Sequence, residues 1–172
     1  MSKKIAGNAP EETLVKAKSD ALRLLSVRPR SVEELRGRLR LKRYADPVIS
    51  LVLASFEKQG LLNDEKFAKL FAQSRLYSRP VGKRELEFEL RKKGLSKPLI
   101  SQTLENLGEY DEVETARQLV FTRFHKMTGI SEEKKKARLF GFLKRRGFSS
   151  TAIFSALAKL FKDYQNSEEN EE

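Results

Sequence analysis

Cysteine and tryptophan are absent from this chain of 172 residues, and His125 is its only histidine. Without cysteine the chain can form no disulfide, thiolate nucleophile or cysteine-ligated zinc site, which fits a reducing compartment. His125 has no evident partners for a catalytic triad. Glu85, Glu87 and Glu89 alternate along an expected helix, so they point in different directions and cannot form one metal cage. We therefore expect no enzyme, no metal and no other cofactor.

Long apolar runs are also missing. No stretch of about 18 apolar residues could span a bilayer, and the start "MSKKIAGNAPEETL" lacks the apolar core of a signal peptide. We expect a cytoplasmic protein that binds neither a membrane nor a small-molecule substrate.

Positive charge is abundant. Lys and Arg number 35 against 24 Asp and Glu, which gives a formal net charge of +11. The cations concentrate in residues 28–43 and 134–146, whereas the final residues "DYQNSEENEE" are acidic. Such an imbalance favours an acidic partner, either a nucleic acid or an acidic protein surface.

One helical pattern recurs three times without gaps, beginning at Val32, Lys83 and Lys136. Leucine or isoleucine occupies the same four positions of each copy, in two i, i+4 pairs. Such pairs lie on one stripe of an α-helix, so each copy predicts two amphipathic helices joined by a tight turn. The shared positions are Leu35, Leu39, Ile49 and Leu53 in the first copy, Leu86, Leu90, Ile100 and Leu104 in the second, and Leu139, Leu143, Ile153 and Leu157 in the third.

The turn between the two helices carries its own signals. Gly94 and Gly147 occupy the position where a helix commonly ends in a left-handed residue, and an apolar residue follows each. Arg43 stands at this position in the first copy, so we expect that turn to differ.

Polar residues are expected to cap the helices. Asp46, Ser96 and Ser149 would cap the second helix of each copy, and Ser31 and Ser131 would begin the first helix of copies one and three.

Another periodic segment precedes each copy, so each unit should contain three helices. We predict an all-α fold of nine helices in three tandem three-helix units that form an elongated body. The predicted units are residues 1–60 with a flexible N-terminus, 61–108 and 109–162, followed by an acidic disordered tail at 163–172.

At least three cations gather near the end of the first helix of every copy. Cations stabilise the last turn of a helix by about 0.3 to 1 kcal/mol each, which explains one or two of them and leaves two interpretations open. They either form a solvated basic face or, if the units stack regularly, a broken basic stripe that binds an acidic partner. The candidate binding residues are Arg36, Arg40, Lys42 and Arg43 in the first copy, Arg91, Lys92 and Lys93 in the second, and Lys144, Arg145 and Arg146 in the third.

Aromatic residues give a second, weaker indication. Phe88 lies on the side of its helix opposite the leucines and predicts either packing between units or contact with a partner. Tyr44 and Tyr77 stand beside arginines and could either stack on bases or pack at the surface. Six phenylalanines at apolar periodic positions are expected to fill the core: Phe67, Phe71, Phe121, Phe142, Phe148 and Phe154.

The segment 61–100 carries an ordered set of residues: Asp64, Phe67, Ala68, Arg75, Gly82, Glu89, Leu90, Lys93 and Gly94. In this set the segment resembles the central region of the RecX family, bacterial regulators of the recombinase RecA. The first and last units also resemble the corresponding units of that family, so the similarity spans roughly residues 20–160.

The resemblance implies a curved, all-helical protein that lodges in the groove of the RecA filament on DNA. Such a protein modulates ATP hydrolysis and strand exchange in recombination, DNA repair and the SOS response without being an enzyme, and we expect it to be a monomer. Two alternatives remain open: a DNA-binding module that acts without the recombinase, and a helical scaffold for another acidic protein.

Overall fold

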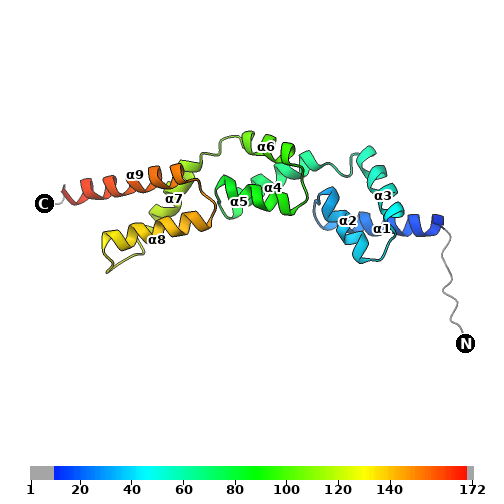
Figure 1. The fold of residues 1–172 in the computed structure, drawn as a ribbon, viewed down its shortest axis with the longest axis horizontal. Helices are drawn as coiled ribbons and strands as arrows, with labels where there is room; N and C mark the ends of the chain where they lie inside the picture. The colour runs from blue at the N-terminus through cyan, green and yellow to red at the C-terminus, as the bar shows by residue number, and fades with distance from the viewer. Residues whose placement is uncertain (1–9, 170–172) are drawn as a thin grey trace, which may run out of the picture.

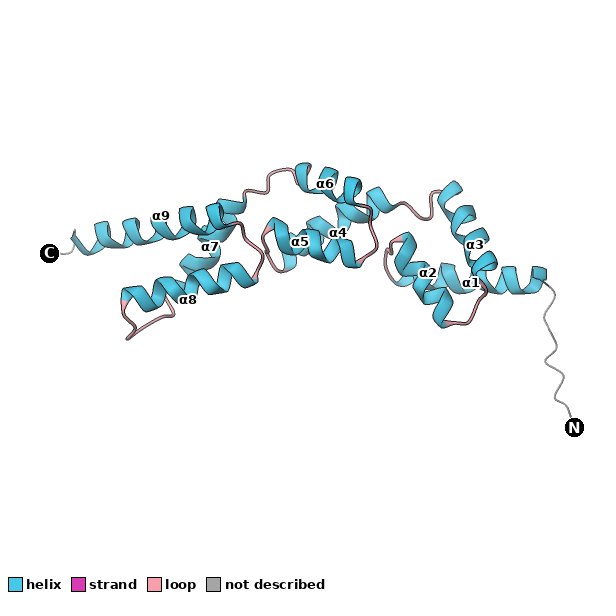
Figure 2. Cartoon of the chain, in the orientation of Figure 1, coloured by secondary structure: helices cyan, strands magenta, loops and turns pink. Residues whose placement is uncertain are grey.

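The computed structural model describes residues 10–169, which fold into helices and the loops that connect them (Figure 1). No strand occurs in this part of the chain (Figure 2), so the prediction of an all-α fold is confirmed. The helices are α1 (Pro10–Val27), α2 (Val32–Leu41), α3 (Asp46–Lys58), α4 (Asp64–Ser78), α5 (Lys83–Lys92), α6 (Lys97–Glu105), α7 (Glu112–Phe124), α8 (Glu132–Arg145) and α9 (Ser150–Glu169).

Each group of three successive helices has its own apolar core. The buried side chains of the described residues form three separate clusters, one within α1–α3, one within α4–α6 and one within α7–α9. The leucines of the recurring pattern, such as Leu35, Leu86 and Leu139, are fully buried in these clusters. The i, i+4 spacing thus places its apolar stripes in the core, as predicted.

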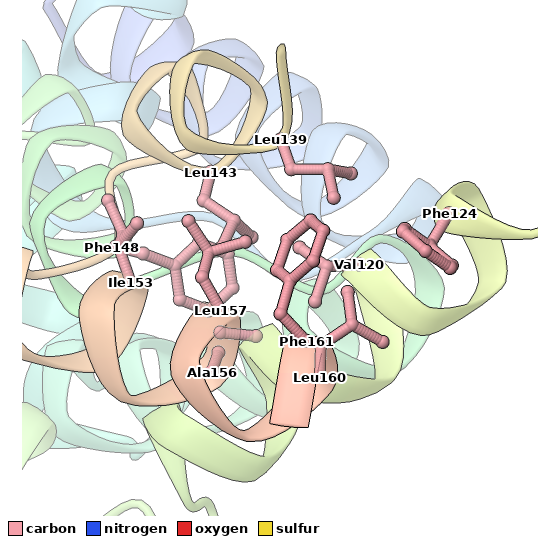
Figure 3. Packing of buried hydrophobic residues seen from close by; sticks show 11 residues of the cluster. Val120, Phe124, Leu139, Leu143, Phe148, Ile153, Ala156, Leu157, Leu160 and Phe161 are labelled. Atoms are coloured by element: carbon pink, nitrogen blue, oxygen red, sulfur yellow. The ribbon is translucent and has the colours of Figure 1, made fainter. Parts of the chain in front are cut away.

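The core between α7, α8 and α9 illustrates this arrangement (Figure 3). Leu139 and Leu143 project from α8 toward Val120 of α7 and Leu157 of α9, and all four lie in one cluster. Phe148, in the turn after α8, closes the end of this cluster and is almost fully buried. A unit of about 50 residues buries limited surface, so contacts with its neighbours contribute to its stability.

The tight turn has the same backbone conformation in all three units. Gly94 (φ 80°) and Gly147 (φ 73°) adopt the predicted left-handed conformation. Arg43 adopts it as well, with φ 64°, so the prediction that the first turn differs is wrong. A backbone N–H after each turn donates to a carbonyl near the end of the preceding helix: from Tyr44 to Leu39 (3.3 Å), from Leu95 to Leu90 (3.4 Å) and from Phe148 to Leu143 (3.3 Å).

The turn of the third unit docks on the start of α5 in the second unit. The Gly82 N–H donates to the Arg146 carbonyl at 2.9 Å, and the Arg84 N–H donates to the Gly147 carbonyl at 3.2 Å. A Cβ atom at Gly147 would lie only 2.3 Å from the backbone nitrogen of Glu85. This position therefore requires glycine for close approach as well as for its left-handed backbone.

The turn of the second unit docks in the same way on the start of α2. The Ser31 hydroxyl donates to the Lys93 carbonyl. A Cβ atom at Gly94 would lie 2.4 Å from the Cβ atom of Glu33. We call these two contact regions the first joint, between units one and two, and the second joint, between units two and three.

An acidic residue completes each joint. The carboxylate of Asp64, at the start of α4, accepts a hydrogen bond from the Val32 N–H at 2.9 Å. The carboxylate of Glu112, at the start of α7, accepts from the Lys83 N–H at the same distance. Both donors are the first helical N–H of the preceding unit's second helix, which has no partner within its own helix.

The joints arrange α8, α5 and α2 head to tail along one side of an elongated body (Figure 1). Within the described residues no unit precedes the first, so the turn at Arg43 meets no neighbouring helix start and a side chain fits there. Within the described part of the chain, no unit follows the third and docks on it. Accordingly, α8 begins at Glu132, four residues before the repeated pattern does at Lys136.

Several expected boundaries and caps differ from the structure. Helix α9 continues to Glu169, whereas a disordered tail was expected from residue 163; residues 1–9 and 170–172 lie outside the described part of the chain. Ser31 and Ser149 accept hydrogen bonds from backbone N–H groups as caps, as expected. Ser96 and Ser131 occupy the cap position without a side-chain bond, and Asp46 is the first residue within α3 rather than its cap.

Replacing Gly147 with alanine should destabilise the protein more than the same change at Gly60. Both residues have a left-handed backbone, but a Cβ atom at Gly60 meets nothing within 4 Å. Gly60→Ala should therefore cost about 1 to 2 kcal/mol from backbone strain alone, and Gly147→Ala should cost that amount plus the loss of the second joint. Urea unfolding of the two variants measures the difference. Equal losses would show that the joint contributes no stability.

Leu143→Ala should lower the free energy of unfolding by about 2 to 5 kcal/mol, because it leaves a cavity in a fully buried position. The control is Leu41→Ala, whose side chain is 76% exposed and which should change stability by less than about 0.5 kcal/mol. Denaturant unfolding of both variants tests the core assignment, and a small loss for Leu143→Ala would contradict it.

Candidate partner-binding surface

The ends of α2, α5 and α8 carry the cations that the sequence predicts as a binding surface. All three ends lie on the same side of the body in Figure 1, along the row that these helices form. The cations at the ends of α2, α5 and α8 therefore follow one another along this row. The individual side chains, however, have different surroundings.

At the end of α2, three of the four candidate cations are paired with carboxylates. Arg43 is exposed and pairs with no carboxylate among the described side chains, residues 11–164. The pairs are Arg36 with Glu33 (2.8 Å), Arg40 with Asp46 (2.8 Å) and Lys42 with Asp20 (3.0 Å).

The three cations at the end of α5 have three different roles. Arg91 forms an ion pair with Glu87, one helical turn earlier. The Nζ atom of Lys92 lies 4.3 Å from the centroid of the Phe88 ring. Lys93 faces the first joint, where its Nζ atom lies 3.5 Å from a carboxylate oxygen of Glu34 and its carbonyl accepts from Ser31.

At the end of α8, as at the end of α5, only the last cation lies at a joint. Lys144 and Arg145 are exposed and pair with no carboxylate of the described residues. Arg146 lies at the second joint, where its Nη1 atom donates to the Pro80 carbonyl at 3.0 Å. Its guanidinium carbon also lies 4.8 Å from the centroid of the Phe142 ring.

Electrostatics distinguish the two joints. At the first joint, a hydrogen bond from Arg28 is the main cause that lowers the pKa of Glu34, and Lys93 and Arg30 add to it. At the second joint, burial lowers the pKa of Arg146, and Arg79, Arg75 and Arg123 lower it further. Arginine stays charged at neutral pH in any case. At the second joint three arginines thus act on a fourth, Arg146, whereas at the first joint cations surround the Glu34 carboxylate.

The ten candidate cations thus fall into two groups. Lys93 and Arg146 contact the neighbouring unit and help to hold the joints. The others lie along the row outside the joints, and Arg43, Lys144 and Arg145 are exposed there without a carboxylate partner in the described residues. That these cations bind a partner stays a prediction.

Several aromatic residues differ from the expectation. Phe121 and Phe154 are more than half exposed, so their assignment to the core is wrong, whereas Phe67 and Phe148 are buried. Phe88 is also exposed, so it does not pack between units.

The two tyrosines have opposite surroundings. The Tyr44 hydroxyl donates to Asp20 at 2.9 Å, and its ring packs against the first core. Tyr77, in contrast, is 92% exposed. Packing at the surface therefore accounts for Tyr44, while the Tyr77 ring is open to a partner.

Three arginines near Arg146 are missing from the predicted set: Arg75, Arg79 and Arg123. Arg75 and Arg79 come from the end of α4, and Arg123 comes from the end of α7. Only the docking of the units brings Arg75 and Arg79 close to Arg123 and Arg146, so helical periodicity could not identify the group. In the sequence, the only indication that Arg79 lies beyond the end of α4 is its position directly before Pro80.

Within residues 10–169, no group of three or more acidic or histidine residues could hold a metal ion. In the same range, every helix is too short or too polar to cross a membrane.

Profiles of known protein families match all three units. The profile of the RecX first three-helix domain matches residues 17–55, that of the second matches 63–104, and that of the third matches 109–157. Together they cover most of the chain in the order that the structure shows.

Curated relatives carry the same family name. Proteins named "Regulatory protein RecX" are similar over most of their length: one from Amycolatopsis mediterranei (strain U-32) is 32% identical over 90% of this chain and 89% of its own. One from Mycolicibacterium smegmatis is 37% identical over 83% of this chain and 78% of its own. One from Chlorobium limicola is 34% identical over 83% of this chain and 87% of its own.

Solved structures share the fold. The crystal structure of RecX from Lactobacillus salivarius superposes with a TM-score of 0.78 at 22% identity, covering 87% of this chain and 97% of that one. A second crystal structure, of a regulatory protein RecX, superposes with a TM-score of 0.74 at 21% identity, covering 83% and 70%.

Arg146→Gln should lower the free energy of unfolding by about 1 kcal/mol, because it removes the hydrogen bond to the Pro80 carbonyl. Relief of repulsion from the neighbouring arginines offsets only a small part of this, since solvent screens their charges. The matched control is Arg145→Gln, at an exposed position, which should change stability by less than about 0.5 kcal/mol. Thermal or urea unfolding measures the stability of both variants. Equal stabilities would show that Arg146 does not stabilise the second joint.

Proposed function

The chain belongs to the RecX family, and we propose that it is a non-enzymatic regulator of a RecA-type recombinase. It binds in the groove of the recombinase filament on DNA and alters ATP hydrolysis and strand exchange. In this role it takes part in recombination, DNA repair and the SOS response, in the cytoplasm and as a monomer. The three-unit architecture and the family name of its relatives support this proposal.

The arrangement of α2, α5 and α8 in one row is the main structural support for this proposal. A filament offers the same surface again at each subunit, and a body that repeats its own binding element can contact several subunits at once. The exposed cations at the three helix ends are Arg40, Lys42, Arg43, Arg91, Lys92, Lys144 and Arg145. They suit acidic side chains or phosphates that recur along such a groove.

Spreading contacts over three units explains how weak individual contacts can suffice. Each exposed ion pair contributes little binding free energy alone. Because the three units are joined in one chain, binding of one unit holds the others near their own sites and so raises their effective concentration there. Such binding should weaken as salt rises, because exposed charges are screened beyond about 10 Å at 0.1 M ionic strength.

A stand-alone DNA-binding module is the second candidate. The exposed cations that lack a carboxylate partner in the described residues, such as Lys144 and Arg145, favour it. This candidate predicts binding to naked DNA together with no effect on the recombinase. A scaffold for an unrelated acidic protein predicts neither activity.

The ATP turnover of a RecA-type recombinase on single-stranded DNA tests the proposed function. Adding the protein at low salt should change the turnover rate, because binding in the groove acts on the filament that hydrolyses ATP. No change at saturating concentration would contradict the proposal.

Two charge variants then test the row. Replacing Arg91, Lys92, Lys144 and Arg145 with glutamine should raise the concentration needed for half the effect by at least about tenfold, with little change in thermal stability. The control replaces four exposed lysines outside the row with glutamine: Lys16, Lys58, Lys66 and Lys69. Both variants lose the same charge, so an equal weakening would mean that net charge matters and the row does not.

A further inference from the structure

Four arginines from three helices converge at the second joint. Arg75 and Arg79 come from the end of α4, Arg123 from the end of α7 and Arg146 from the end of α8. We call these four residues the joint arginines. They belong to two different units, so the cluster exists only when the second and third units are docked.

Two of the joint arginines hold the chain between α4 and α5. Arg75 donates to the carbonyl of Arg79, and Arg146 donates to the carbonyl of Pro80 at 3.0 Å. Arg75 also donates to the carboxylate of Glu89, at 2.7 to 2.9 Å. Arg75 and Arg146 are therefore only partly exposed and fixed in position.

The other two joint arginines present their charge to solvent. The guanidinium carbon of Arg123 lies 4.6 Å from the centroid of the Phe142 ring, and that of Arg146 lies 4.8 Å from the same centroid. Arg79 and Arg123 are exposed, and neither pairs with a carboxylate of the described residues.

The cluster has a large excess of positive charge for its size. Among the described side chains, residues 11–164, Glu89 is the one carboxylate that pairs with a joint arginine. Glu112, also at this joint, accepts hydrogen bonds from the Lys83 N–H and from Ser149. The charged groups that act on Arg146 are all arginines, and together with burial they lower its pKa. Folding holds these like charges together, so an anion that binds among them relieves their repulsion.

We propose that the joint arginines form a binding site for the phosphates of a nucleic acid strand. Arg79 and Arg123 supply the contacts to phosphate oxygens, and Arg75 and Arg146 position the segment that carries Arg79. Guanidinium groups suit this role because their planar N–H donors can bind two phosphate oxygens at once. The site goes beyond the regulatory role, since it requires no recombinase.

Two observations favour a nucleic acid over an acidic protein. A nucleic acid strand carries one phosphate per nucleotide, about every 3.4 Å per strand along a duplex, so its regular series of charges can reach both exposed arginines and continue along the row of exposed cations. In addition, Tyr77, two residues before Arg79, is 92% exposed, and an exposed aromatic ring can stack on a base.

The test measures the affinity of the whole protein for a fluorescent single-stranded oligodeoxynucleotide over a range of salt concentrations, without recombinase. The variant Arg79→Gln with Arg123→Gln leaves the two positioning arginines in place. It should reduce the slope of log affinity against log salt by roughly 1.4, because each phosphate neutralised on a single strand contributes about 0.7. At 0.1 M salt its affinity should be roughly 25-fold lower, given equal affinities near 1 M.

The matched control is Arg38→Gln with Arg138→Gln, two exposed arginines outside the joint. This variant loses the same charge and should reduce the slope by less than half as much. Equal reductions in the two variants would overturn the proposal, and so would the absence of oligonucleotide binding by the unaltered protein at low salt.

Competition with poly-glutamate separates a phosphate site from a carboxylate site. Poly-glutamate at the same charge concentration should displace the oligonucleotide poorly, and the Arg79 and Arg123 variant should not alter its weak binding. Strong displacement that depends on these two arginines would assign the cluster to an acidic protein instead. A change in recombinase ATP turnover is a separate measurement, so failure of this site leaves the regulatory role in place.

Discussion

The architecture depends on how the tight turns of the second and third units cover the start of a helix in the unit before each of them. An α-helix leaves its first N–H groups without partners, and these groups must bond to something when they are covered. In α5 the carbonyls of Arg146 and Gly147 and the carboxylate of Glu112 accept from the N–H groups of Gly82, Lys83 and Arg84. Since backbone atoms make most of these contacts, the two units approach closely only where glycine removes the side chain.

This docking explains how one sequence pattern serves two purposes. The helix end needs cations for its last turn, and the docked turn places the last of them, Lys93 or Arg146, against the neighbouring unit. The remaining cations stay outside along the row. The cationic helix end therefore has two parts: its last cation contacts the neighbouring unit, and its other cations form part of the exposed charged surface. At the second joint the same geometry gathers arginines that lie far apart in the chain.

Helical periodicity was enough to predict the elements and the three cores, because burying an apolar stripe depends only on i, i+4 spacing within a helix. Leu39, Leu90 and Leu143 show this, since all are fully buried. Periodicity could not show that Arg43 adopts the same left-handed backbone as Gly94 and Gly147. The turn at Arg43 differs from theirs only in that no neighbouring unit docks on it within the described residues, so a side chain fits there. Likewise, Phe154 shares the spacing of core residues but lies where no helix covers it. The joint arginines depend on contacts between units, which no local pattern encodes.

Amide hydrogen exchange at the helix starts tests the docking of the units most directly. The N–H groups of Val32, Gly82, Lys83 and Arg84 bond to the following unit, so they should exchange slowly, and together with one another at each joint. Those of Glu132 and Glu133 begin α8, which no following unit covers in the described chain, so they should exchange rapidly and serve as the internal reference. Exchange at the starts of α2 and α5 as fast as at the start of α8 would contradict the account, because the units would then not be docked through their turns.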